Sequence, residues 1–293
     1  MKINKILTMW LVTGVCSTAF AFETNSSYQT DSPYQAHKET AVSSAVGTPW
    51  KAKRHKQLIK SVTDATGLLE NAQDLTYPIS EESLKEIYGD KATIPFFAYS
   101  SLIDKESPAA KAISPTSLAT HAPAIAFGLA RTFNRQMPSS AAENWGPLRK
   151  PNDVAILNAF EKEDAVVNGV VLQLPLADLM ILAKREVGYD LVPVLAMRWN
   201  DALDENKSPE LFVAYTFIAP DYEGTGEQFT NDRINPIPGY VTFLQKGLQP
   251  FGEDFEAMWW ATTYMGDKET PLSEVIYSDI DLATTPENAP QSK

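Results

Sequence analysis

From about residue 94 onward, short apolar runs alternate with polar stretches along the chain. These runs are rich in β-branched and aromatic residues, which favours strands over helices. In Val154–Leu157 every position is apolar, which is typical of a strand covered on both faces. The pattern therefore predicts about six strands, over residues 94–102, 122–130, 153–160, 166–174, 192–199 and 211–218.

Other segments carry the apolar spacing of helices. Residues 177–187 and 253–264 predict helices among and after the strands. Before the strands, the basic run 51–60 leads into an amphipathic helix, and a second helix extends from Ser80 to Gly89, which can adopt a left-handed cap. A polar hairpin turn is expected at residues 161–164. Together these elements predict an α+β protein, with a small mixed β-barrel or strongly curved sheet of about six strands and flanking helices.

The first 21 residues have the pattern of a secretory signal. Lys2 and Lys5 precede a short apolar run that ends in Ala19-Phe20-Ala21, the small-x-small pattern of a cleavage site. A membrane anchor is less favoured because the run is shorter than the about 20 residues that span a bilayer. A lipid anchor on Cys16 is less favoured because Val15 stands where a small residue is needed. We expect cleavage after Ala21 and an exported protein, periplasmic or secreted.

Composition predicts the remaining domain organisation. Residues 22–48 are rich in Ser, Thr, Gln and Asn and cannot bury enough apolar surface to offset their ordering entropy, so we expect a flexible leader. Residues 49–92 are assigned to a helical N-terminal extension and residues 93–283 to the main domain. The polar, proline-containing residues 284–293 are assigned to a flexible tail.

Charge and cysteine content narrow the classes of function. The net charge of -12 argues against nucleic acid or an anionic membrane surface as the main partner, and no integral membrane span is expected. The only cysteine, Cys16, would leave with the signal, so the mature chain would lack a thiolate nucleophile. His37, His55 and His121 lack metal-site spacing, and no phosphate-binding loop or dinucleotide fingerprint is present. We therefore expect no metal and no cofactor.

Glu186 is the most informative residue of the helix predicted at 177–187. It recurs at helical spacing with Leu179, Leu182 and Ala183, which places a carboxylate on the core-facing stripe. Buried acids are rare unless paired or used, and burial would raise the pKa of this one toward a value that suits a base near neutrality. The alternative is a carboxylate at the rim of the stripe, in water or paired with Arg131 or Arg198.

The apolar strand that begins near residue 94 stops abruptly in hydroxyl residues at Ser100 and Ser101. Backbone amides at such a strand end can form a small nest for an anion or a carbonyl oxygen. The alternative is an ordinary serine-containing turn. A serine hydrolase built on either serine with His121 is disfavoured because the chain has no G-x-S-x-G elbow.

Four short motifs follow one another in an order that resembles the gamma-glutamylcyclotransferase (AIG2-like) family. The resemblance covers about Ile94 to Pro193, with a weaker similarity around Gly239-Tyr240 and residues 255–263. The four segments are Phe97–Leu102 (family F-x-Y-G-S-L), Ala126–Asn134 (G-x-x-R-x-F-N), Val167–Leu172 (V-x-G-V-L-Y) and Ala177–Tyr189 (D-L-x-x-L-D-x-x-E-G-Y).

The resemblance implies an intramolecular acyl transfer without a cofactor. A gamma-glutamyl amine or peptide attacks its own side-chain carbonyl and releases 5-oxoproline and a free amine. By position, Glu186 would be the catalytic base and then the acid that protonates the leaving amine. The substrate-binding residues implied in the same way are Tyr99, Ser100, Ser101, Leu102, Arg131 and Tyr189.

Ser100 departs from the family pattern, which has glycine at this position. If the residue must adopt a positive φ or let the substrate approach the backbone closely, a Cβ there costs on the order of 1 kcal/mol or blocks the pocket. This departure keeps a second hypothesis open, a non-catalytic secreted binding module that retains the fold and the pocket. The identity of the amine, the oligomeric state and any protein partner are not indicated by the sequence.

Overall fold

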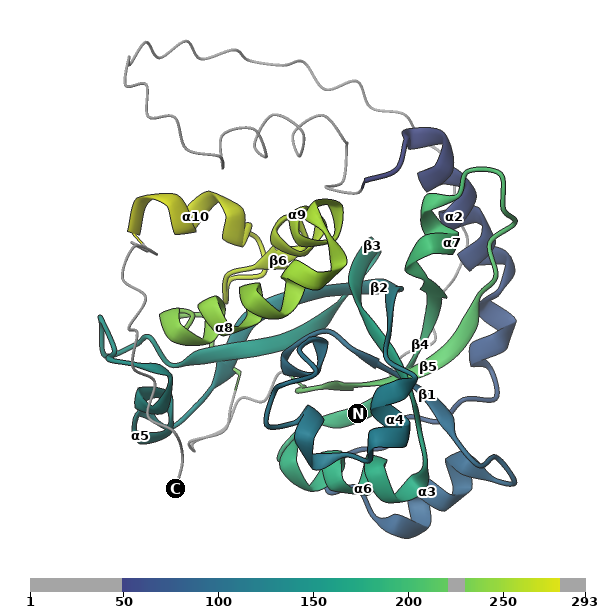
Figure 1. Ribbon diagram of the computed structural model, residues 1–293, viewed down its shortest axis with the longest axis horizontal. Helices are drawn as coiled ribbons and strands as arrows, with labels where there is room; N and C mark the ends of the chain where they lie inside the picture. The colour runs from purple at the N-terminus through teal and green to yellow at the C-terminus, as the bar shows by residue number, and fades with distance from the viewer. Residues whose placement is uncertain (1–48, 221–229, 280–293) are drawn as a thin grey trace.

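The computed structural model describes residues 49–220 and 230–279. Within them, five strands close into a barrel in the order β3-β1-β5-β4-β2, and β2 pairs with β3 to complete the ring (Figure 1). β1 and β5 are parallel and the other pairs of the ring are antiparallel, so the predicted mixed barrel of an α+β protein is confirmed. A sixth strand, β6, runs parallel to β2 outside the ring. The strands are β1 (Ile94–Ala98), β2 (Ala122–Gln136), β3 (Ala155–Leu174), β4 (Asp190–Arg198), β5 (Phe212–Ile218) and β6 (Thr263–Tyr264).

The hairpin predicted at residues 161–164 is wrong. The two apolar runs that flank it form one strand, β3, and both pair with β2 rather than with each other. Phe127 lies opposite Val166 and Leu129 lies opposite Glu161, so residues 162–165 bulge out opposite the single residue Gly128. Gly128 has a φ of 75°, a conformation that glycine adopts without strain. Local polarity thus marks a bulge in a long ribbon, not a reversal of the chain.

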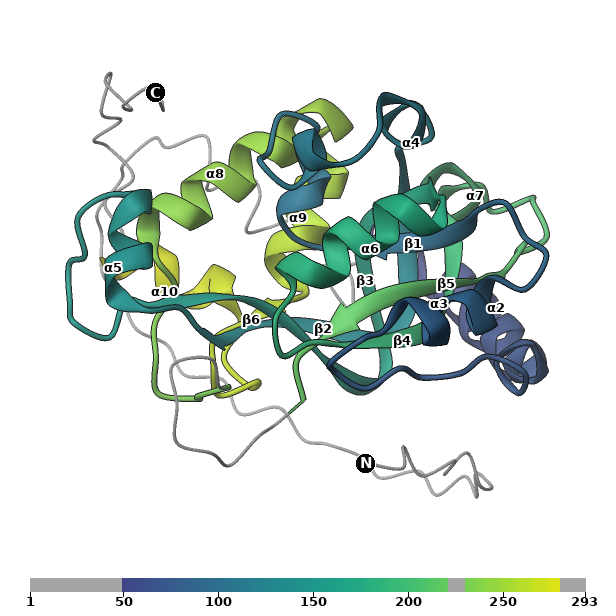
Figure 2. The same cartoon turned by 90° about the horizontal axis from the view of Figure 1, so that it is seen from below.

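The strand positions that are apolar at both parities are buried on both faces, as predicted. Residues 166–172 of β3 are all buried, with side chains alternating between the barrel interior and the covering helices. The C-terminal helices α8 (Pro238–Leu248), α9 (Glu253–Ala261) and α10 (Leu272–Asp279) gather on the side of the β2–β3 ribbon away from α2 (Ala52–Asp64) and α3 (Glu81–Tyr88) (Figures 1 and 2).

Helices with strong local sequence signals, such as capping residues, lie close to their predicted positions. α3 is capped by Ser80, whose side chain accepts a hydrogen bond from the amide of Ser83, and ends at Gly89 with a φ of 52°. α6 (Leu176–Arg185) begins one residue before the predicted helix 177–187, α9 begins with the predicted helix 253–264, and both end earlier than predicted. Three short helices, α4 (Pro115–Ala119), α5 (Ser139–Ala142) and α7 (Trp199–Leu203), and the longer α8 and α10, have no counterpart in the predicted elements.

The N-terminal extension packs against the barrel and shares its hydrophobic core. Leu58 of α2 and Leu84 of α3 are fully buried in that core. Arg54 is also buried, and its guanidinium donates to the carbonyl oxygens of Ala202 (3.1 Å), Asp201 (2.6 Å) and Lys207 (2.8 Å). The extension is therefore held to α7 and the segment after it by hydrogen bonds from a buried cation.

A segment between α2 and α3 also contacts the start of β4. Leu75 and Leu191 exchange two backbone hydrogen bonds of 2.8 Å. The amide of Tyr77 donates to the carboxylate of Asp190, also at 2.8 Å. The first residues of β4 are thus held from outside the barrel by a segment more than a hundred positions earlier in the chain.

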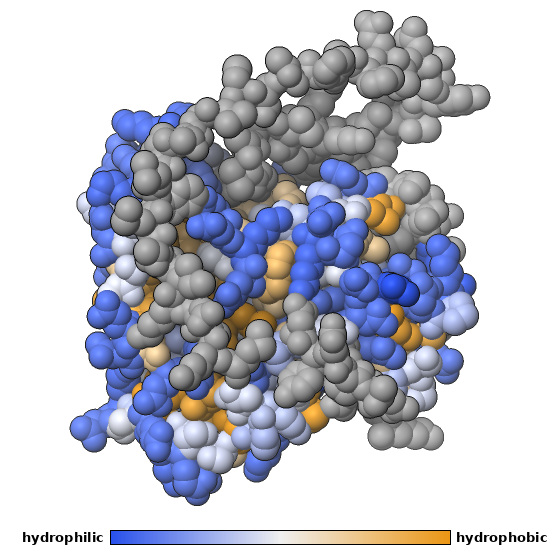
Figure 3. All heavy atoms as spheres, turned by 180° about the vertical axis from the view of Figure 1, so that it is seen from behind, coloured by the Kyte–Doolittle hydropathy of each residue, from blue (hydrophilic) through white to orange (hydrophobic). Residues whose placement is uncertain are grey.

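The face opposite to that of Figure 1 is mainly hydrophilic, with hydrophobic residues in separate patches (Figure 3). None of the helices in residues 49–220 and 230–279 is long and apolar enough to cross a membrane. The predicted signal (1–21), leader (22–48) and tail (284–293) lie outside the described residues.

Candidate active site

Glu186 follows the last residue of α6 and lies in the turn that leads into β4. Its amide still donates to the carbonyl of Leu182 at 3.0 Å, but its backbone angles (φ −88°, ψ 63°) are no longer helical. Gly188 has a φ of 78°, and the amide of Tyr189 donates to the carbonyl of Glu186 at 3.2 Å. The prediction that Glu186 lies on the apolar stripe of the helix is therefore wrong, because the chain has already begun to turn toward β4.

The carboxyl group of Glu186 is nevertheless shielded from water. The residue keeps part of its surface exposed, yet burial of its carboxyl group raises its pKa to about 7, against the opposing charges of Arg185 and Arg135. In the part of the chain that the structure describes, no group donates a hydrogen bond to this carboxylate. Near neutral pH Glu186 can therefore both take up and release a proton.

Three buried tyrosines lie within electrostatic range of Glu186. Tyr99 follows β1, Tyr189 precedes β4, and Tyr240 belongs to α8. Burial is the main cause that raises the pKa of each phenol, and the negative charge of Glu186 raises it further. All three side chains therefore stay protonated at neutral pH and form a largely aromatic surrounding for the carboxyl group.

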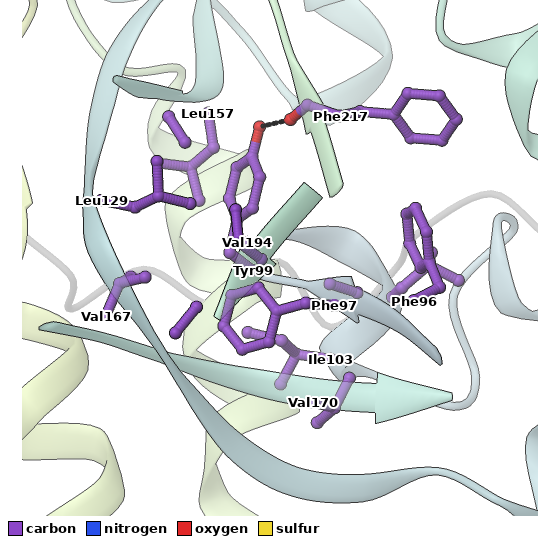
Figure 4. Packing of buried hydrophobic residues seen from close by; sticks show 14 of the residues in the cluster. Phe96, Phe97, Tyr99, Ile103, Leu129, Leu157, Val167, Val170, Val194 and Phe217 are labelled. Carbon is purple, nitrogen blue, oxygen red and sulfur yellow. Dashed lines mark hydrogen bonds between the residues drawn. The ribbon is translucent and has the colours of Figure 1, made fainter. Parts of the chain in front are cut away.

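Two of these tyrosines are anchored to backbone carbonyls of the barrel. The Tyr99 hydroxyl donates to the carbonyl oxygen of Phe217 at 2.7 Å, and its ring lies among Leu129, Leu157 and Val194 (Figure 4). The Tyr189 hydroxyl donates to the carbonyl oxygen of Leu157 at 3.3 Å. Tyr99 and Tyr189, both expected to bind substrate, are thus brought close to Glu186 by the barrel itself.

The segment from Ser100 to Leu102 lies at the end of β1, beside this group. Ser100 has a φ of −128°, so its conformation does not require glycine, and the expected strain at this position is not present. Its hydroxyl lies within hydrogen-bonding reach of Tyr240. Residues Ser101–Ile103 form a 3₁₀ turn whose first bond joins the Ile103 amide to the Ser100 carbonyl at 2.9 Å. The amides of Ser101 and Leu102 precede that bond and have no acceptor within the turn.

Arg131, the remaining residue expected to bind substrate, lies in the protein interior. Its side chain is fully buried and stacks over the ring of Trp259, with 5.2 Å between the guanidinium carbon and the ring centre. It donates to Asn168 of β3, and to Thr262 at 2.6 Å and Thr263 at 2.9 Å near β6. The structure thus gives Arg131 the role of joining β2, β3 and the C-terminal segment.

Two residues of the site are absent from the sequence prediction. Tyr240 comes from α8, and the weak similarity around Gly239-Tyr240 was the only signal for it. Arg135 is 4% exposed and follows the G-x-x-R-x-F-N segment by one position on β2. Its guanidinium carbon lies 5.0 Å from the centre of the Tyr189 ring. A second arginine near the end of a largely apolar segment was the available sign that this side chain has a specific role.

A cavity of about 340 Å³ lies between residues 232–235 and the segment 265–275. Neither Glu186 nor any of the three tyrosines lines it. Its lining includes Asp232, Arg233 and Asp267, and Asp267 already accepts hydrogen bonds from Glu269 and Thr270. The carboxyl group with the raised pKa, and not this cavity, therefore defines the candidate active site.

No protein-family model matches the chain, and no curated protein matches it. Among solved structures it is similar to YkqA from Bacillus subtilis, with 16% identity and a TM-score of 0.41 over 60% of this chain and 55% of that one. It is also similar to a gamma-glutamyl cyclotransferase (15%, TM-score 0.36, 57% and 84%) and to a yeast one described as specific to glutathione (15%, TM-score 0.36, 58% and 97%). The chain spans about half the length of YkqA. Two of these solved structures bear the name of the family that the sequence motifs resemble.

Proposed function

We propose that the protein is a cyclotransferase that converts a gamma-glutamyl amine or peptide to 5-oxoproline and a free amine. The observation that carries this proposal is the Glu186 carboxyl group, desolvated among three tyrosines, with a pKa of about 7. A group with this pKa is suited to proton transfer in both directions at neutral pH. The reaction requires both directions, because a proton leaves one nitrogen and arrives at another.

In the proposed reaction the α-amino nitrogen of the substrate attacks the γ-carbonyl carbon of the same molecule. Glu186 takes the proton of the attacking amine. The bond between the carbonyl carbon and the leaving nitrogen then breaks, and Glu186 returns the proton to that nitrogen. Because nucleophile and electrophile belong to one molecule, the site needs mainly to fold the substrate into a five-membered ring and to exclude water.

The oxygen of the attacked carbonyl becomes negatively charged and needs hydrogen-bond donors. The amides of Ser101 and Leu102 are the candidates, because they precede the first bond of the 3₁₀ turn beside the site. The aromatic rings of Tyr99 and Tyr189 would form the walls that fold the substrate.

The binding-module hypothesis was motivated mainly by Ser100 in place of glycine. The negative φ of Ser100 answers the part of that objection that concerns a positive φ. The other part, a close approach of the substrate to the backbone, is tested by Ser100→Gly. The enzyme is therefore the favoured function. We further propose, from residues 1–21, that the protein is exported, and its substrate is then a gamma-glutamyl compound met outside the cytoplasm.

The test is direct measurement of 5-oxoproline after incubation of the mature protein with a panel of gamma-glutamyl amines and peptides. We expect at least one substrate to be cyclised, and Glu186→Gln to abolish the reaction while a panel member still binds. Glu163→Gln, which changes an exposed acid in the bulge of β3, is the matched control and should retain the parent rate. Binding of panel members without any 5-oxoproline would instead favour the binding module.

A further inference from the structure

Arg135 is a buried cation without a carboxylate partner. Arginine is almost never buried unless it is paired. Within residues 49–220 and 230–279 no Asp or Glu forms an ion pair with it. The buried Arg54 and Arg131 also lack a carboxylate partner, but each donates to several carbonyl, hydroxyl or amide oxygens. Arg135 lies beside the candidate base, because its charge acts on the pKa of Glu186.

The protein uses only part of the hydrogen-bonding capacity of Arg135. Its Nη2 donates to the carbonyl oxygen of Val187 at 2.6 Å, and the side chain also reaches the phenol of Tyr189. An arginine has five N–H donors, so several are left over. In the described part of the chain, the side-chain nitrogen and oxygen atoms that are shielded from solvent and have no hydrogen-bond partner belong to His121, Thr216 and Trp259. The nitrogen atoms of Arg135 are not among them, so each of these atoms either has a hydrogen-bond partner or is accessible to solvent.

The position of Arg135 is fixed relative to Glu186. The carbonyl that it binds belongs to Val187, the residue next to Glu186. The turn leaves room for the guanidinium because position 188 is glycine: a Cβ on Gly188 would lie 2.8 Å from Nη2 of Arg135. The guanidinium and the carboxyl group are thus held by one short turn.

We propose that Arg135 is the residue of this chain that binds the α-carboxylate of the substrate, the group that becomes the carboxylate of 5-oxoproline. This inference rests on the proposed function. The attacking α-amine and the α-carboxylate are attached to the same carbon atom, so a base that reaches the amine has the carboxylate next to it. A planar guanidinium is the side chain that pairs best with a carboxylate, through two parallel hydrogen bonds.

The test compares two substrates, a gamma-glutamyl anilide with a free α-carboxylate and the same compound as its α-carboxamide. With the full chain we expect kcat/KM to be about 10- to 100-fold higher for the carboxylate, the range of a hydrogen bond to a charged group. Arg135→Met should remove this preference, so that the two substrates give nearly equal kcat/KM when they are compared at the same pH. The ratio is the readout because loss of this cation also changes the pKa of Glu186 for both substrates. Arg185→Met is the matched control: it also removes a cation that acts on Glu186, but an exposed one, and should keep the preference.

Equal loss on both substrates, or a parent enzyme without preference, would overturn the assignment. If Arg135→Met does not fold, Arg135→Lys keeps the positive charge but lacks the planar guanidinium with its two parallel donors, and it should show a reduced preference. If the parent releases aniline from neither compound, with 5-oxoproline or its carboxamide as the cyclised product, the proposed function fails, and calorimetric titration with 5-oxoproline and its carboxamide decides the inference separately. Tighter binding of the carboxylate, lost in Arg135→Met, would support it, and equal binding of the two compounds would refute it.

Discussion

The hydroxyl of Tyr99 donates a 2.7 Å hydrogen bond to the carbonyl oxygen of Phe217, across the barrel interior from the end of β1 to β5. The two strands pair in parallel only through Phe96 and Tyr215. The phenol therefore supplements a weak edge of the ring, next to the segment that leads into Ser100. One side chain near Glu186 thus also links two strands of the barrel.

Tyr99→Phe is expected to lower the free energy of unfolding by about 1–3 kcal/mol, because the buried carbonyl of Phe217 loses its donor. Tyr189→Phe removes a longer bond, 3.3 Å to Leu157, and should cost less. Chemical denaturation of the two variants measures both losses. Equal losses would contradict the structural role assigned to the shorter bond.

Glu186→Gln is expected to lower kcat by about 10²- to 10⁴-fold, the usual contribution of general acid–base catalysis. Gln keeps the shape of the side chain and removes a carboxyl group that burial disfavours in its charged form. The melting temperature at neutral pH should therefore stay the same or rise. A variant that turns over at the parent rate would refute the role of Glu186 as the base.

The pH dependence of stability should also report on Glu186. Its pKa in the folded protein, about 7, lies above the ordinary value of 4.5, so the folded state binds more protons than the unfolded state between these values. The resulting stabilisation is present below about pH 4.5 and is lost as the pH rises to about 7. The free energies of unfolding of the parent and of Glu186→Gln, measured across this range, should differ by an amount that grows with pH. A constant difference would mean that the carboxyl group is solvated.

The rate should follow the same titration in the opposite sense. The base must be deprotonated, so kcat/KM is expected to rise with pH through a midpoint near 7. Arg185→Met removes a cation that lowers the pKa of Glu186 and should move the midpoint upward. A midpoint near 4.5 would contradict the desolvated environment of this carboxyl group.

Ser100→Gly is expected to bring no gain in activity, because Ser100 already has a negative φ. The glycine should instead lower stability by about 0.5–1 kcal/mol through the added freedom of the unfolded chain. Ser100→Ala separates this effect from loss of the hydroxyl that reaches Tyr240. A more active Ser100→Gly variant would show that the substrate needs a closer approach to the backbone.

Local sequence signals predicted the elements whose causes are local. Ser80 and Gly89 mark the ends of α3 because a hydroxyl cap and a positive φ depend only on neighbouring residues. The β2–β3 ribbon could not be predicted in this way. Whether residues 161–164 reverse the chain or bulge depends on their pairing with β2, a partner distant in the sequence.

The residues of the candidate site likewise differ in whether a local sequence motif indicates them. Glu186 and Tyr99 were predicted because they lie in motifs with a recognisable order. Arg135 and Tyr240 reach the site from β2 and α8, and only the closed barrel shows that they approach one residue. Arg131 shows the reverse case: its place in a motif suggests substrate binding, whereas in the structure its guanidinium donates to Asn168, Thr262 and Thr263.

The two hydrogen bonds between Leu75 and Leu191 connect the N-terminal extension to the strand that follows the Glu186 turn, although the extension contributes no residue to the candidate site. Leu191 follows Tyr189 by two residues, so the turn that carries Glu186 is braced by a segment outside the stretch that resembles the family. Substitutions in residues 49–92 can therefore change the geometry of the candidate site although none of these residues belongs to it. If residues 94–193 alone were inserted into another protein, the motifs would be present, but the hydrogen bonds from Leu75 that hold the start of β4 would be missing.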